Sequence, residues 1–182
     1  MVKRTAVESQ TVEEEVSTAN TVVNARAFSE SELRGIGTFE DALRVYTEVT
    51  GDVIETAEGA IGDGFVQVDE VFKRKLIGVP LFVMSWEFKV SEKVIKNGQP
   101  SRYVQMRIVA QHANGKVGKY LVSDGSTGIL AQLDAYTERT GRYQGLMCPN
   151  GLRVSDYKYT DPASGDVSDA STYYIDNAPA LR

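Results

Sequence analysis

The chain has 182 residues, 42% hydrophobic and 25% charged, which is typical of a globular protein with one domain and an ordered extension. No apolar run approaches the roughly 18–20 residues that a membrane-spanning helix needs, and the N-terminus lacks a signal-peptide pattern, so we expect a cytoplasmic protein with no membrane partner. The only cysteine and histidine, Cys148 and His112, allow no internal disulfide and no zinc cluster. We therefore expect no metal, no cofactor and no enzymatic activity.

The net charge of −5 hides a strong asymmetry along the chain. Residues 35–72 carry one basic and nine acidic side chains, whereas residues 73–119 carry ten basic and two acidic ones, a net of +8. A local basic block in an acidic protein is a pattern typical of polyanion binding.

The N-terminal part predicts an extension rather than a second domain. Residues 1–35 are polar, without helical or alternating apolar spacing, and are interpreted as a flexible arm. Residues 36–72 are interpreted as a helical extension, with one amphipathic helix at residues 39–50. Thr38 and Asp41 resemble a capping box at its start.

The remaining residues, 73–182, predict mainly β structure with one helix. Strands are expected at residues 80–90, 102–111, 116–123, 151–160 and 171–176, with a helix from residue 129 that ends at Gly141. On the second strand Val104, Met106, Ile108 and Ala110 share an apolar face. This order of elements matches a five-stranded OB-type barrel, mainly β with some α content, whose helix lies between strands 3 and 4. A split-sheet α+β domain would give the same order.

Aromatic and basic side chains alternate within the basic block, as single-stranded nucleic acid binding requires. Tyr103, Gln105 and Arg107 share the face opposite the apolar one on the second predicted strand. We expect phosphate contacts or base stacking from Trp86, Lys89, Tyr103, Arg107, Lys116, Lys119, Tyr120, Arg153 and Tyr157. Trp86 has an alternative interpretation as a core residue, because Met84 and Phe88 lie two positions away on either side.

The most distinctive string is the turn at residues 124–129, Asp-Gly-Ser-Thr-Gly-Ile. A hydroxyl N-cap explains it structurally, and free amides at a helix start could also receive a phosphate. It lacks the Gly-Lys-Ser/Thr end of a P-loop, which disfavours nucleotide hydrolysis.

This turn, together with the strings at residues 76–80, 85–88, 151–157 and 171–174, resembles a family of small actinobacteriophage proteins described as single-stranded DNA-binding proteins. The resemblance spans residues 38–176. It implies an OB-fold and work on single-stranded DNA in replication or recombination, in the host cytoplasm. It assigns no particular DNA contacts.

The predicted function is therefore sequence-tolerant binding of single-stranded DNA by a homo-oligomer, with replication or recombination proteins as further partners. One alternative is a structural or virion assembly protein that uses the barrel and the N-terminal arm for protein–protein contacts. The other is an enzyme acting on nucleic acid, which the absence of a metal cluster or phosphate loop disfavours.

Overall fold

The computed structural model describes residues 28, 36–52, 54–55, 59–61, 64–96 and 98–176. Three helices and seven strands occur in these residues. In chain order they are α2 (Phe39–Thr50), β1 (Val66–Gln67), α3 (Glu70–Arg74), β2 (Leu81–Lys96), β3 (Gln99–Gln111), β4 (Val117–Asp124), α4 (Thr127–Thr140), β5 (Gln144–Cys148), β6 (Leu152–Thr160) and β7 (Val167–Ile175). The fold is mainly β, as the sequence predicted.

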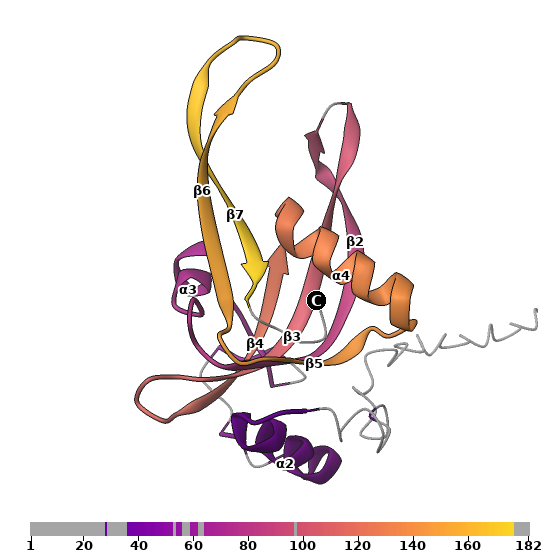
Figure 1. Cartoon of the computed structure of the whole chain (residues 1–182), viewed down its shortest axis with the longest axis vertical. Helices are drawn as coiled ribbons and strands as arrows, with labels where there is room; N and C mark the ends of the chain where they lie inside the picture. The colour runs from indigo at the N-terminus through magenta and orange to yellow at the C-terminus, as the bar shows by residue number, and fades with distance from the viewer. Residues whose placement is uncertain are drawn as a thin grey trace, which may run out of the picture.

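The five-stranded sheet has the order β1-β4-β3-β2-β5, and all its pairs are antiparallel except β1 with β4 (Figure 1). Strands β2, β3 and β4 form a meander of successive hairpins. Among the strands of the described residues, β6 and β7 form a ladder with each other alone and make a second sheet of two strands. The β2–β3 hairpin and the β6–β7 hairpin both extend to the same end of the molecule (Figure 1).

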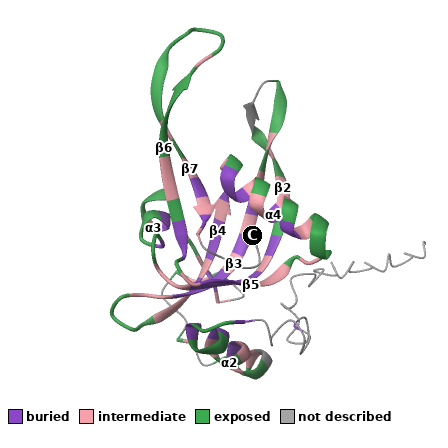
Figure 2. Cartoon of the chain, in the orientation of Figure 1, coloured by how far each residue is buried: buried purple, intermediate pink, exposed green. Residues whose placement is uncertain are grey.

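Two hydrophobic clusters cover the two sides of the five-stranded sheet. We call the side that packs against α4 the core face; Val104, Met106 and Ile108 on β3 are buried there with Leu133 of α4. On the opposite side, the end of the sheet nearest α2 is covered by a smaller cluster that includes Phe82 and Val109. Buried and partly exposed residues alternate along β3 from Val104 to Ile108, which confirms the predicted apolar face (Figure 2). Val109 is also buried, because the α2 cluster covers that end of the opposite side.

The described part of the chain contains no closed barrel, so the predicted OB-type barrel is not confirmed. Strands β1 and β5 form the two edges of the five-stranded sheet, and the β6–β7 sheet shares no strand ladder with it. Two isolated bridges, from Ile77 to Gly151 and to Leu152, contact the base of β6. The OB-type arrangement therefore remains a prediction, whereas the mainly β character is established.

Helix α2 has the predicted bounds, but its cap and backbone differ from expectation. Thr38 makes no side-chain capping bond, so the predicted capping box does not form. From Thr38 to Glu48 every φ lies between 32° and 52°, which is the left-handed region. For L residues that conformation costs about 1–2 kcal/mol per residue.

The predicted N-terminal arm lies outside the described residues except for Phe28. Its ring packs against Phe82, with 5.7 Å between the ring centroids, and its side chain is buried. Composition gave no sign of this contact, because one phenylalanine in a polar stretch has no periodicity. The predicted boundary at residue 72 falls inside α3, whose N-cap Asp69 accepts a hydrogen bond from Phe72 N.

Two details of β2 and β5 were not predicted from the sequence. Strand β5 was not predicted, since it is short and contains Gly145; it pairs with β2 at the edge of the sheet. A register shift between Val83 and Ser85 leaves Met84 without a partner on β3. This β-bulge turns Met84 to the α2 side and Trp86 to the core face, although the two are two positions apart.

Candidate nucleic-acid interface

The side of the sheet away from α4 carries a polar surface at the end not covered by α2. Residues directly opposite each other in antiparallel strands project to the same side. The pairs Lys89↔Tyr103, Glu87↔Gln105, Ser85↔Arg107 and Gln105↔Ser123 therefore place seven side chains on one surface. We call it the polar face: Ser85, Glu87, Lys89, Tyr103, Gln105, Arg107 and Ser123.

Hydrogen bonds across the strands hold the centre of the polar face in place. Lys89 Nζ donates to Gln105 Oε1 at 2.9 Å, and Gln105 Nε2 donates to Ser123 Oγ at 3.5 Å. Lys89 Nζ also lies 3.3 Å from the carboxylate of Glu87. The amide of Gln105 thus links β2 to β4 across β3, and the surface is ordered before any ligand arrives.

Arg107 and Lys119 both lie near the buried ring of Phe65, at the end of the polar face nearest α2. The Arg107 guanidinium is 6.0 Å and the Lys119 ammonium 5.7 Å from the centroid of Phe65. Phe65 precedes β1, which pairs in parallel with β4. Sequence reasoning missed Phe65, because nothing in its spacing predicts a contact with cations that lie 42 and 54 residues further along the chain.

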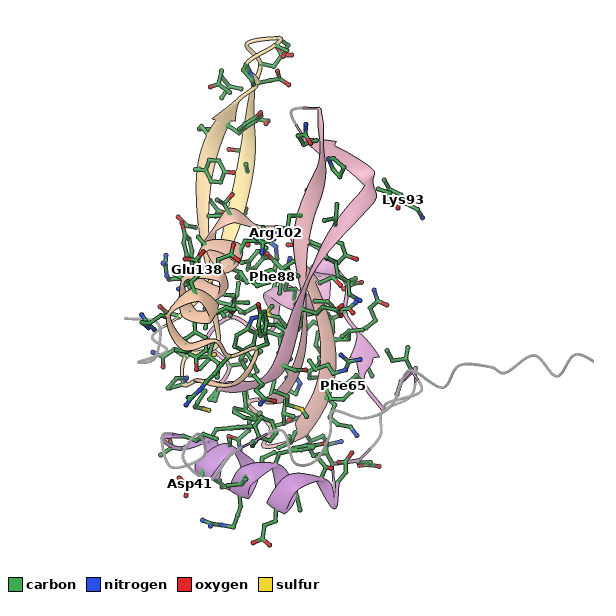
Figure 3. All side chains as sticks on the ribbon, turned by 90° about the vertical axis from the view of Figure 1, so that its right-hand side faces the viewer. Asp41, Phe65, Phe88, Lys93, Arg102 and Glu138 are labelled. Atoms are coloured by element: carbon green, nitrogen blue, oxygen red, sulfur yellow. The ribbon has the colours of Figure 1, made fainter. Side chains whose placement is uncertain are left out.

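The polar face and α4 lie on opposite sides of the sheet. Figure 3 shows Lys93 projecting from the β2–β3 hairpin on the side of Phe65, away from Glu138 of α4. Three cations of the basic block therefore lie on the side of the sheet opposite α4: Lys89, Lys93 and Arg107. The acidic residues Asp134 and Glu138 belong to the helix side.

Much of the basic block is neutralised within the fold. Lys73 lies 2.6 Å from Asp124, Lys119 contacts Asp52 at 2.5 Å, and Arg102 contacts Asp134 at 2.6 Å. The acidic partners come from the flanking segments of opposite charge. The charge asymmetry of the sequence is thus partly an internal complementarity, and it overstates the number of cations available to a polyanion.

Lys119 and Trp86 are not available as surface contacts. Lys119 is 5% exposed, because its strand position faces the α2 cluster beside Val109. Trp86 is 4% exposed and packs on Tyr136, with its Nε1 donating to Thr137 Oγ1 at 3.3 Å. The structure therefore supports the core interpretation of Trp86 and gives Lys119 an ion-pairing position.

Tyr120 and Lys116 lie at the other end of β4, away from the polar face. Tyr120 is opposite Ile108, so it projects to the core face, where its ring packs on Phe72 at 4.8 Å. The Tyr120 hydroxyl is 2.6 Å from Nε2 of His112. Lys116 is exposed in the β3–β4 turn. Neither residue joins Tyr103 and Arg107 on one surface.

The β6–β7 hairpin carries a second aromatic surface. Arg153, Ser155, Tyr157 and Tyr159 share one side of β6, and Tyr174 and Thr172 lie opposite the first two on β7. Arg153 stacks over the ring of Tyr174 at 4.5 Å. Tyr157 and Tyr159 are 47% and 44% exposed. We call this surface the tyrosine face; the other side of the hairpin carries the Lys158–Asp169 pair.

The turn at residues 124–129 attaches β7 to the sheet rather than forming an open anion site. Ser126 makes no capping bond with its side chain, so the predicted hydroxyl N-cap is wrong. Instead Ser126 Oγ donates to Tyr173 O at 3.2 Å, and Thr172 Oγ1 accepts from Gly128 N at 3.2 Å. A hydroxyl from another strand therefore caps α4.

An ionic cluster, built on the buried Lys73–Asp124 pair, supports the same junction. Lys73 contacts Asp124 and Glu70, and Tyr173 donates to Glu70 Oε1 at 2.6 Å. Burial raises the pKa of Tyr173 to about 12, with the Glu70 hydrogen bond adding to the shift. Burial alone would raise the pKa of Glu70, but hydrogen bonds from Lys73 and Tyr173 outweigh it and lower that pKa.

Other chemistry has little support in the described residues. Cys148 is fully buried, and burial raises the pKa of its thiol, so it is not an activated nucleophile. The described residues contain no group of three or more His, Cys, Asp or Glu side chains that could hold a metal ion. None of the helices in the described ranges has the length and apolar character to cross a bilayer.

Comparisons of the chain with protein-family models, with curated proteins and with solved structures find no match.

Proposed function

We propose that this protein binds single-stranded DNA without sequence preference and that the polar face is the main contact surface. The observation that carries the proposal is the row Tyr103, Gln105, Arg107 on the uncovered end of the sheet. It offers an aromatic ring, an amide and a guanidinium on the side of the sheet that also bears Lys89 and Lys93.

The chemistry of this row suits an unpaired strand. Aromatic rings stack on any base, and cations follow the phosphates, so affinity does not depend on sequence. In this proposal Tyr103 stacks on a base, and Arg107 and Lys89 contact phosphates. Arg153 and Tyr157 of the tyrosine face extend the contact, with Lys116 as a peripheral cation.

We further propose an OB-type arrangement for β2, β3, β4, α4, β6 and β7, whose order along the chain is that of the OB fold. In that fold the second and third strands, with the loops joining strands 1–2 and 4–5, bind oligonucleotides. The β2–β3 and β6–β7 hairpins occupy those two loop positions in the order of elements. Self-association and a role in phage replication or recombination are parts of the proposal that rest on the sequence alone.

A second candidate function is assembly with other proteins, such as in a virion. The observation that favours it is the internal neutralisation of Lys73, Arg102 and Lys119, which leaves fewer cations for phosphates than the sequence suggests. Hairpins that extend from a compact sheet also suit protein contacts.

The two candidates are separated by titrating labelled oligothymidylate, the same length of mixed sequence, and the matching duplex at several salt concentrations. Single-strand binding predicts similar affinity for the two single strands, weaker duplex binding, and a log–log salt slope of at least about −2. Arg107→Ala should lower the affinity, whereas Lys75→Ala, which removes the exposed cation at the C-cap of α3, serves as the matched control. A flat salt response would favour the assembly function.

A further inference from the structure

We infer that α4 is a clamp that fixes the angle between the two long hairpins, with Asp134 and Gln132 as its positioning residues. The part of this inference that concerns DNA affinity rests on the proposed function. The part that concerns the spacing of the hairpins is independent of it. The basis is a set of hydrogen bonds from one helix to both hairpins.

The contact of α4 with the β2–β3 hairpin is a bidentate ion pair. Arg102 Nη1 and Nη2 donate to the two carboxylate oxygens of Asp134 at 2.6 and 2.8 Å. The guanidinium also lies 4.1 Å from the centroid of the Phe88 ring on β2. Planar pairing and stacking together leave the Arg102 side chain little freedom. The helix therefore contacts both strands of this hairpin through one guanidinium.

The contact of α4 with the β6–β7 hairpin uses a side-chain amide as a strand partner. Gln132 Oε1 accepts from Ile175 N at 2.8 Å, and Gln132 Nε2 donates to Ile175 O at 3.0 Å. These are the two bonds that a neighbouring strand would make to that residue. The bond from Gly128 N to Thr172 Oγ1 adds a third polar contact on the same strand.

The clamp matters because no strand ladder fixes the hairpins relative to each other. Within the described residues, β6 and β7 form a sheet separate from that of β2 and β3. Gln132 and Asp134 lie only two positions apart on α4, yet their bonds reach different hairpins. A rigid helix that holds both hairpins sets the distance between the tyrosine face and the β2–β3 hairpin.

The test measures the distance between the hairpins in the full chain without DNA. Spin labels at Lys93→Cys and Ser168→Cys, both exposed positions, report that distance; Cys148 stays unlabelled because it is fully buried. We expect Asp134→Ala to broaden the distance distribution and to weaken single-strand binding about threefold to tenfold. The charge-reversed pair Arg102→Asp with Asp134→Arg should restore a narrow distribution.

Glu138→Ala, one turn further along α4, is the matched control and should change neither readout. An unchanged distance distribution in both Asp134→Ala and Gln132→Ala would overturn the clamp. If the parent chain binds no single-stranded DNA while Asp134→Ala still broadens the distribution, the proposed function fails and the clamp stands.

Discussion

Lys73 Nζ lies 2.6 Å from Oδ2 of Asp124, and the two side chains are 8% and 1% exposed. The pair joins α3 to the end of β4, next to the turn that attaches β7. A buried ion pair stabilises a fold weakly overall, but the loss of one partner leaves an uncompensated charge in the interior.

We expect Lys73→Met to lower the free energy of unfolding by about 3–5 kcal/mol, because the Asp124 carboxylate stays buried without its cation. Lys73→Met with Asp124→Leu should recover much of that loss, since both charges are then absent. Urea unfolding followed by circular dichroism measures both variants. Lys75→Met, at the exposed C-cap of α3, is the control, and its free energy of unfolding should lie within about 0.5 kcal/mol of the parent's.

The raised pKa of Tyr173 predicts that the folded protein loses stability at alkaline pH. Its pKa is raised from 10.0 to about 12 in the folded protein, so folding favours the protonated phenol. This contribution is complete below pH 10 and is lost as the pH rises toward about 12. Tyr173→Phe lacks this titration, and its unfolding free energy should fall less than that of the parent over this interval. Equal pH dependence in the two proteins would contradict the assignment.

Gly128→Ala tests the attachment of β7 to α4. A Cβ at this position would lie 2.2 Å from the carbonyl oxygen of Tyr173 and 2.7 Å from ring atoms of Tyr174, so β7 has to move. We expect a loss of about 1–3 kcal/mol and faster amide exchange in β7. The matched control is Gly125→Ala in the same turn, where the nearest atom is 3.6 Å away. Similar exchange rates in the two variants would contradict the close contact.

On the polar face, Arg107→Ala and Tyr103→Ala should weaken DNA binding in different ways. The loss of one phosphate contact reduces the salt slope by about 0.7, whereas the loss of a stacking ring costs about 1–3 kcal/mol with the slope unchanged. Fluorescence anisotropy at several salt concentrations separates the two effects. If both variants alter the slope equally, Tyr103 does not act as a stacking platform.

The sequence predicted those elements that have a strong local pattern. The alternation of β3 and the apolar spacing of α4, followed by Gly141, located both elements within a few residues. Strand β5 was missed because its five residues lack alternation. The bulge at Met84 could not be foreseen either, because one extra residue changes sides only when a partner strand fixes the register.

The candidate site was predicted in part. Tyr103, Gln105 and Arg107 share a surface because strand alternation is local, and Tyr157 and Tyr159 align for the same reason. The sequence did not predict the burial of Lys119 or decide that of Trp86, because burial depends on which segments of the chain cover each side of the sheet. The partners that neutralise the basic block, such as Asp124 for Lys73, depend on chain folding over long separations.

The burial of Trp86 has a consequence for spectroscopy. It is the only tryptophan in the chain, and its indole lies between the sheet and α4, in contact with Tyr136 and hydrogen-bonded to Thr137. Its emission therefore originates in an apolar interior, away from the polar face. Tryptophan emission therefore reports how α4 packs on the sheet, and a ligand on the polar face does not contact the indole directly.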